Sequence, residues 1–442
     1  MTLDMVHESS LKNYPLILGS IENIEVAKMK VKESLGQFDL TLNSKLDSRE
    51  KGYYDGKSAD ITLEKPLGFM NSKIYTGYRI SDGTYPLYEG KNNTLDSGES
   101  RIGVELSLWR NRDIDEKRLK LWNNQLNVST KEQKFLSNKV KIEKESTKAY
   151  WKWVTSGHIY LVYLDLLEVA IKRDNGLNRR IQKGDLAKIY ASENQQYILK
   201  RKTQVLEAKR DFYEASLLLS LFLRNEEGHP VIPLEEQLPK SFKQEAPLSI
   251  VTLNNDLERA RKLSPVIRNL DLKRQQLSNE EMLGQTKISP KLDLNFEVSR
   301  DNGRGSSALE QEENRIFLKI EIPIERRLAR GKIEKARAQK RVVSYQQQLT
   351  LETMEANLKS LFQKLNTSSE TILNTTKEVE LAQILEKAEN RKFSRGASDF
   401  FVVNLREQAS ADAKVKNMKA RYEYNQNLAE YKAMTFALID EQ

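Results

Sequence analysis

The sequence predicts a mainly α-helical protein that also carries a few membrane-type β-strands. Three observations lead to this fold class. The 442-residue chain is 31% charged and holds only 19 glycines and 10 prolines, which favours long helices. Four short segments alternate apolar and polar residues one by one, which predicts strands with two different faces. Both features occur twice along the chain, which predicts an internal tandem repeat.

The repeat is seen in two aligned stretches and two aligned glycines. "RIGVELSLWRNRDIDEKR", which begins at Arg101, aligns with "RIFLKIEIPIERRLARGK", which begins at Arg315, at an offset of 214 residues. Each stretch leads into a long charged helical run that stops near a glycine, Gly184 or Gly396, 212 residues apart. Several landmarks in the same order indicate duplication of one structural unit.

We therefore expect two repeats, residues 1–224 and 251–442, joined by a proline-rich irregular linker over 225–250. Each repeat should run in the order helix, strand, strand, long helix, glycine turn, long helix. Pro15 and Pro265 stand near the start of a helix in each repeat.

The predicted strands cover about 68–81, 101–110, 290–300 and 315–325. Each has one apolar face, such as the isoleucines and leucine of "IFLKIEI". The opposite faces carry charge: Lys73, Arg79, Arg101, Glu105, Asp293, Glu297, Lys319 and Glu321.

The helices are expected to pack as long antiparallel coiled coils. After the first glycine turn, an apolar residue recurs at every seventh position: Ile198, Val205, Phe212 and Leu219. The helix predicted over about 114–183 would be roughly 100 Å long at about 1.5 Å per residue.

Four strands are too few to close a membrane barrel, since the smallest barrels need about eight. Their lengths suit a tilted membrane crossing of about 9–11 residues. Lipid cannot satisfy an open sheet edge, so we expect other copies of the chain to complete the sheet. The charged faces would then line a water-filled lumen. In an alternative interpretation they are the solvent side of a small sheet that covers a core.

Composition argues against several other classes. The chain has no cysteine, and its three histidines lie far apart, so we expect no metal site, no cofactor and no enzyme activity. The net charge of +9 comes from interleaved acids and bases, which argues against a nucleic-acid partner. No stretch of about 18 residues is uniformly apolar, so we expect no transmembrane helix. The N-terminus does not read as a secretory signal, and for an exported protein the signal is expected to have been removed.

The chain resembles the TolC-type outer-membrane factors, the exit ducts of bacterial efflux pumps and type I secretion systems. The resemblance is carried by the "TLD…NYP" opening, the "SP" that starts the second repeat, strands that lead into charged helices, and "F-x-x-G-x-S" at Phe393–Ser398. It implies a homotrimer in the outer membrane with four strands per chain in one shared twelve-stranded barrel. It also implies an α-helical tunnel through the periplasm, with a periplasmic adaptor and an inner-membrane transporter as partners.

The resemblance places the periplasmic aperture and the adaptor-docking surface at the two glycine turns. The residues expected there are Arg179, Arg180, Lys183, Gly184, Asp185, Lys188, Arg391, Lys392, Arg395, Gly396, Ser398 and Asp399. The family often has an aspartate six residues after the glycine, where this chain has Tyr190 and Val402. We hypothesise that Asp185 and Asp399 instead pair with neighbouring basic residues and hold the resting duct shut.

The main alternative to a duct is a coiled-coil scaffold, either soluble or periplasmic, that never inserts into a membrane. A basic coiled coil that binds nucleic acid is a weaker alternative, because acidic residues interrupt every basic stripe.

Overall fold

A computed structural model describes residues 1–85, 93–240 and 250–437 of the chain. The predicted linker over 225–250 therefore lies partly outside the described residues. The main helices are α1 (Leu3–Asn13), α2 (Pro15–Leu35), α3 (Glu116–Gln182), α4 (Ile189–Ser220), α5 (Ile250–Leu263), α6 (Pro265–Thr286), α7 (Arg327–Ser394) and α8 (Phe400–Met434). The strands are β1 (Thr41–Arg49), β2 (Gly56–Pro66), β3 (Lys73–Gly83), β4 (Glu99–Ser107), β5 (Lys291–Asp301) and β6 (Glu312–Glu321).

The order of elements is similar in the two halves, except that the first half has four strands where the sequence predicts two. A short helix and a helix that begins at Pro15 or Pro265 precede the strands in each half. Proline suits the first position of a helix because it lacks only an N–H that would have no helical partner there. The strands are followed by a very long helix, of 67 residues in α3 and 68 in α7, and then by a returning helix.

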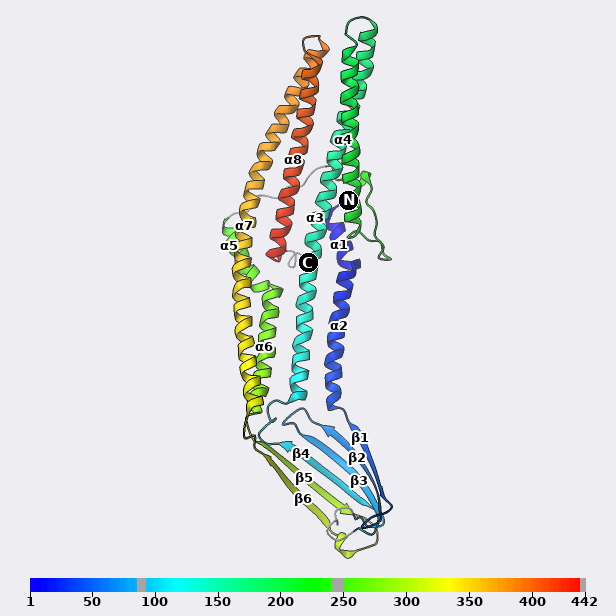
Figure 1. Ribbon diagram of the computed structural model, residues 1–442, viewed down its shortest axis with the longest axis vertical. Helices are drawn as coiled ribbons and strands as arrows, with labels where there is room; N and C mark the ends of the chain where they lie inside the picture. Colours follow the sequence, from blue (N-terminus) through cyan, green and yellow to red (C-terminus); the bar gives the residue numbers. More distant parts are fainter. Residues whose placement is uncertain (86–92, 241–249, 438–442) are drawn as a thin grey trace. The chain divides into compact units, whose positions relative to one another are not determined.

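All six strands lie side by side in one antiparallel sheet, in the order β1-β2-β3-β4-β5-β6 (Figure 1). β3, β4, β5 and β6 are the four strands that the sequence predicts, with ends shifted by a few residues. The prediction of four strands per chain was wrong, because β1 and β2 form an additional hairpin ahead of them. The twelve-stranded barrel that the resemblance implies, with four strands per chain, does not fit this count.

Residue contacts divide the chain into two compact units, and each unit draws on both halves of the sequence. One unit comprises Met1–Ile21, Lys134–Ile267 and Leu349–Gln442; the other comprises Glu22–Gln133 and Arg268–Gln348 and contains the sheet. This division does not follow the two sequence repeats, whose boundaries stay a prediction.

The first unit is helical and contains two hydrophobic clusters. In one, Val6 of α1 packs with Trp153 of α3 and Leu219 of α4, all fully buried. In the other, α5, α7 and α8 contribute residues such as Leu257, Leu358 and Tyr424. Each cluster thus joins a short helix, a long helix and a returning helix, and Phe212 and Leu219 of the apolar stripe predicted along α4 belong to the first cluster.

One described helix, α3, contains an 18-residue stretch that is apolar enough, by length and composition, to cross a membrane. This finding does not test the expectation of no transmembrane helix, which stays a prediction. A third of the stretch is buried inside the protein. Because core helices of soluble proteins pass the same test, this stretch alone does not make α3 a membrane span.

Candidate functional site

The sheet has one continuous apolar face. The strand registers align Leu46, Ala59 and Ile80 in one row across β1, β2 and β3. The same face continues across β4, β5 and β6. Its residues there include Ile102, Val104, Phe296, Val298, Ile316, Leu318 and Ile320. Most of these side chains are exposed although they are large and apolar; Ile316 is 71% exposed and Leu46 is 79% exposed. An exposed apolar face of this extent marks a surface that meets something other than water.

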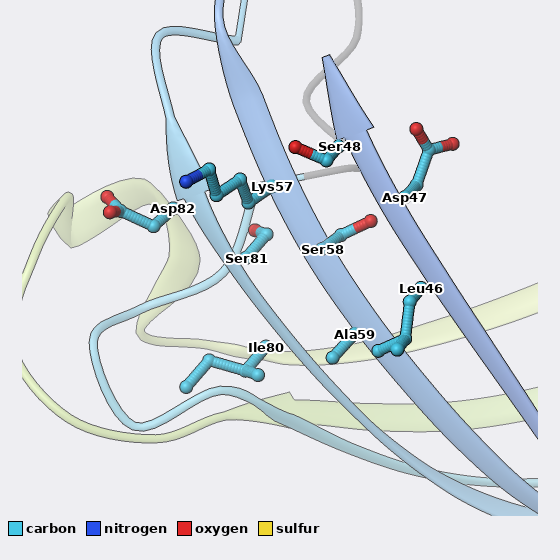
Figure 2. Close-up of a pocket in the computed structure, with 9 residues that line it drawn as sticks. All are labelled: Leu46, Asp47, Ser48, Lys57, Ser58, Ala59, Ile80, Ser81 and Asp82. Atoms are coloured by element: carbon cyan, nitrogen blue, oxygen red, sulfur yellow. The ribbon is translucent and has the colours of Figure 1, made fainter. Parts of the chain in front are cut away.

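Figure 2 shows the outer part of this face over β1, β2 and β3. The small side chain of Ala59, between Leu46 and Ile80, leaves a shallow hollow of about 460 Å³. Polar residues end the apolar band beyond it, among them Lys57, two positions from Ala59 on the same face of β2. Lys65 ends the band at the other end of β2, about 26 Å along the strand at about 3.3 Å per residue. This length agrees with the roughly 25 Å height of the apolar band on membrane barrels.

The opposite face of the sheet is polar and carries ion pairs between strands, one of which, Arg101–Asp60, reaches from β4 to β2 across Gly77 of β3. The pairs, with their N–O distances, are Lys73–Glu64 at 3.3 Å, Lys73–Glu105 at 3.2 Å, Arg79–Glu99 at 2.5 Å, Arg101–Asp60 at 2.7 Å and Arg315–Glu297 at 3.6 Å. Opposite charges on facing strands stabilise a sheet, and here they run from β2 to β6. One chain therefore satisfies much of the charge on this face by itself.

All eight charged strand residues singled out from the sequence lie on this polar face. Besides the pairs above, Ser107 donates a hydrogen bond of 2.8 Å to Asp293, and Glu321 pairs with Arg110 at 3.0 Å. The hydroxyl of Tyr75 donates a hydrogen bond of 2.7 Å to Glu297. Lys319 stands opposite Asp293 in the register of β5 and β6.

The sheet also has two open edges. Within the described residues, β1 pairs only with β2, and β6 pairs only with β5. Every residue of both edge strands is exposed. A long, exposed edge strand presents a row of backbone hydrogen-bonding groups that can pair with another chain.

The two glycine turns share one backbone geometry. Gly184 and Gly396 have φ of +82° and +75°, in the left-handed region. The N–H of Gly184 donates to the carbonyl of Ile181 at 3.0 Å, and the next N–H donates to the carbonyl of Arg180 at 2.9 Å. The turn at Gly396 has the same two hydrogen bonds, at 3.0 and 2.9 Å. Both helices thus end in a Schellman motif, which needs a left-handed residue at the glycine position.

The charged residues of these turns are mostly exposed. Arg179 and Arg180 lie in the last turn of α3, and Arg391 and Lys392 in the last turn of α7, where positive charge suits the helix dipole. The carboxylate of Asp399 accepts a hydrogen bond of 2.8 Å from the backbone N–H of Phe401, so this residue caps α8. In the described part of a single chain, neither Asp185 nor Asp399 forms an ion pair. Their hypothesised pairing with basic residues stays a prediction for an assembly.

A buried aromatic residue connects the two turns. Phe400, at the start of α8, is 2% exposed and contacts Tyr190 and Tyr197 of α4 edge to face, with ring centroids 6.2 and 6.1 Å apart. Phe393 packs on it from α7 at 6.3 Å. A cavity of about 430 Å³ lies beside these rings and is lined by both turns, including Gly396, Ser398 and Asp399.

Behind Phe400 lies a buried charge network that sequence reasoning missed. The side chain of Glu407 on α8 is fully buried and pairs with Arg173 of α3 and with Arg201 of α4, the latter at 3.0 Å. Asn404 accepts a hydrogen bond of 3.0 Å from Arg173. Burial lowers the pKa of each arginine to about 10, and both remain charged at neutral pH. We call the two turns, Phe400 and this network the tip region.

One sequence signal could have revealed the network. Arg201 stands three residues after Ile198, the position that Ala208 and Ala215 occupy in the following heptads. A charge on the buried stripe of a helix needs a partner, since an unpaired buried charge is costly. Arg173 and Glu407 have no comparable signal in the sequence.

Among the described residues, no group of three or more histidine, aspartate or glutamate side chains is placed to hold a metal ion.

The fold is that of solved outer-membrane channels. The Campylobacter jejuni CmeC outer-membrane channel is 12% identical, with a TM-score of 0.66 over 99% of this chain and 88% of that chain. The Neisseria gonorrhoeae MtrE outer-membrane channel in its open state is 13% identical, with a TM-score of 0.68 over 98% of this chain and 88% of that chain. The outer-membrane channel OprN is 12% identical, with a TM-score of 0.67 over 98% and 89%. No protein-family profile and no curated protein sequence matches the chain.

Proposed function

We propose that this chain forms the outer-membrane exit duct of an efflux pump or type I secretion system. The observation that carries the proposal is the sheet, whose apolar face and both edges are exposed while its polar face is ion-paired. Such a sheet is stable only where lipid covers the apolar face and sister chains cover the edges. The fold shared with outer-membrane channels supports the same role.

In this proposal the protein is a homotrimer, three sheets share one barrel, and the polar faces line the lumen. The helices continue as a tunnel into the periplasm, and the two glycine turns form the aperture where a periplasmic adaptor docks. An inner-membrane transporter supplies the substrate, and the duct conducts it passively.

Fractionation tests the proposal against a coiled-coil scaffold. The chain should be expressed behind a cleavable export signal in a Gram-negative host and followed through membrane separation. We expect it in the outer-membrane fraction and, after extraction, as a trimer that depends on detergent. Recovery as a soluble protein without detergent would contradict the duct and support a scaffold.

A conductance measurement tests the aperture. The exposed basic residues of the second turn would meet their symmetry copies near a threefold axis, where like charges repel and retain counter-ions. Replacing Arg391, Lys392 and Arg395 with alanine should raise single-channel conductance in planar bilayers. Lys364→Ala with Lys377→Ala, on the exposed surface of the same helix, is the control and should leave conductance unchanged. Equal conductance in both variants would contradict the location of the aperture at these turns.

A further inference from the structure

We propose that β1 of one copy pairs with β6 of the next copy, with Thr41 opposite Glu321 and Arg49 opposite Glu313. This seam, named here the β1–β6 seam, would close three six-stranded sheets into one barrel of eighteen strands. The inference rests on the proposed function, which brings three copies around one axis. It adds which strands meet and in which register.

The first support is strand direction. Each of the five neighbouring pairs in the sheet is antiparallel, so β1 and β6 run in opposite directions. Rotation about a common axis keeps those directions, and β6 of the next copy therefore meets β1 antiparallel. A sheet with an even number of strands closes in this way without any parallel pair.

The second support is the match of charge along the seam. In the proposed register, all nine residues of β1 face Glu313–Glu321, which lie within β6. On the polar face, Asp47 then stands opposite Arg315, and Arg49 stands opposite Glu313. These are two opposite-charge cross-strand pairs of the kind that Arg79–Glu99 and Arg315–Glu297 already form between neighbouring strands on this face.

Other registers lose this match. A shift of one residue would turn the apolar face of one strand toward the polar face of the other. A shift of two residues one way sets Lys45 opposite Arg315, and also Asp47 opposite Glu313. The same shift the other way sets Lys45 opposite Lys319. All three are like-charge pairs, which destabilise a sheet.

A shift of four residues restores opposite charges but shortens the ladder. It places Thr41 opposite Glu325, so the first four residues of β1 lie beyond the end of β6 at Glu321. The backbone groups of those residues would stay unpaired in lipid, which is costly. The proposed register is the one that keeps both the charges and the full ladder.

The third support is the apolar face, which stays continuous across the seam. In the proposed register, Leu42 meets Ile320 and Leu46 meets Ile316, four side chains that are 60% exposed or more in one chain. A barrel of about 16–18 strands encloses an aqueous channel rather than a packed interior. The additional hairpin therefore predicts a wide outer-membrane pore.

Disulfide trapping tests the seam directly, because the chain has no cysteine. Two double variants place cysteines on adjacent rows: Asp47→Cys with Arg315→Cys, and Leu46→Cys with Ile316→Cys. Adjacent rows of an antiparallel ladder alternate in Cα separation between about 5.5 and 4.5 Å, so at least one row should suit a disulfide. Mild oxidation in isolated outer membranes should convert most of the chain into covalent trimers on denaturing gels.

Two further variants are the controls. Asp47→Cys with Lys319→Cys lies four residues out of register and should not cross-link, because the Cα atoms would be more than about 7 Å apart. Tyr78→Cys with Ile316→Cys tests a barrel in which β3, not β1, meets β6 and the additional hairpin stays outside.

Each outcome decides a separate point. Cross-linking of the Tyr78 variant alone overturns the β1–β6 seam but leaves the shared barrel standing. Equal cross-linking of the out-of-register variant overturns the register. A chain that forms no cross-linked oligomer in any variant and stays soluble overturns the proposed function together with the seam.

Exchanging the charges of Asp47 and Arg315 tests the same pairing without cysteines, so the test does not depend on whether the cysteine variants fold. Asp47→Arg should reduce the fraction of heat-resistant trimer in detergent. Because Arg315 also pairs with Glu297 within the chain, Arg315→Asp alone is measured as well, and the double variant should form more trimer than Arg315→Asp alone. A double variant that forms no more trimer than Arg315→Asp alone would contradict the predicted pairing of Asp47 with Arg315.

Discussion

The tip region and the sheet differ in what one chain buries: the tip region buries and pairs its charges, whereas the sheet leaves apolar side chains exposed. In the tip region one chain buries the Glu407 carboxylate completely and pairs it with two arginines from other helices. In the sheet one chain leaves Ile316 71% exposed and the outer edges of β1 and β6 unpaired within the described residues. The tip region is therefore paired within one chain, whereas in the proposed duct the sheet depends on lipid and on other copies.

The largest expected effect is the loss of the buried carboxylate. Glu407→Gln leaves Arg173 and Arg201 buried without their counter-charge, and removing one partner of a buried pair costs about 3–5 kcal/mol. The variant should unfold at lower denaturant concentration when helix content is followed by circular dichroism. Glu378→Gln, which breaks the exposed pair with Lys416, is the control and should cost at most about 1 kcal/mol.

If Glu407→Gln were no more destabilising than the control, the tip region would not be held together within one chain. The contrast between the tip region and the sheet would then be wrong for the tip region.

The next effect tests the sheet. Leu318→Arg places a charge on the apolar face, which costs about 2–4 kcal/mol near the middle of a membrane. We expect the amount of trimer in the outer membrane to fall while the helices of soluble material stay folded. Phe317→Arg is the matched control, since Phe317 is also exposed but lies on the polar face. Equal loss in both variants would show that the two faces do not differ in environment.

A smaller effect is expected at the cap of α8. Asp399→Ala removes the side chain that accepts the N–H of Phe401, and loss of such a cap costs about 0.5–2 kcal/mol. Asp399→Asn should recover most of that stability, because asparagine caps helices equally well. If the residue instead held the duct shut through its charge, Asp399→Asn would raise conductance as much as Asp399→Ala.

The smallest effect is a pH dependence between α6 and α7. Two hydrogen bonds lower the pKa of the Glu281 carboxyl group below its ordinary value of 4.5. The bond from Arg337 has the larger effect, and the bond from Lys340 has the next largest. Because the folded pKa is depressed, the stabilisation is present above about pH 4.5 and is lost as pH falls through the lower folded value. Glu281→Gln should flatten the acid limb of the melting temperature against pH, whereas Glu280→Gln should leave it unchanged.

Alternation and glycine punctuation in the sequence were enough to predict four strands, the two turns and the helix starts at Pro15 and Pro265. β1 was missed because Leu42 and Leu46 are its only large apolar residues, so its apolar face has little hydrophobic contrast. β2 was missed although it alternates, with Ala59, Ile61 and Leu63 on one face and polar residues on the other, so its signal was present in the sequence. Alternation alone also placed the last strand too far along the chain, since the ladder ends at Glu321, before Pro323.

The heptad pattern could have marked Arg201 as buried, but its partners in the tip region could not be predicted because they are distant in sequence. Glu407 is 206 residues from Arg201, and nothing near it in the chain marks it as buried. Local patterns report which face of a helix is apolar, but they do not report which helix that face meets. The network is a property of tertiary packing.

The most direct test of the central claim is a cysteine scan along β6 in the assembled outer-membrane protein. Single cysteines at residues 315–320 would be probed with a water-soluble maleimide and, after labelling with a fluorophore, with lipid-borne quenchers. If the apolar face meets lipid and the polar face meets water, we expect strict alternation: positions 315, 317 and 319 react from water, and fluorophores at 316, 318 and 320 are quenched by the lipid-borne quenchers. Equal reaction from water at all six positions would contradict it.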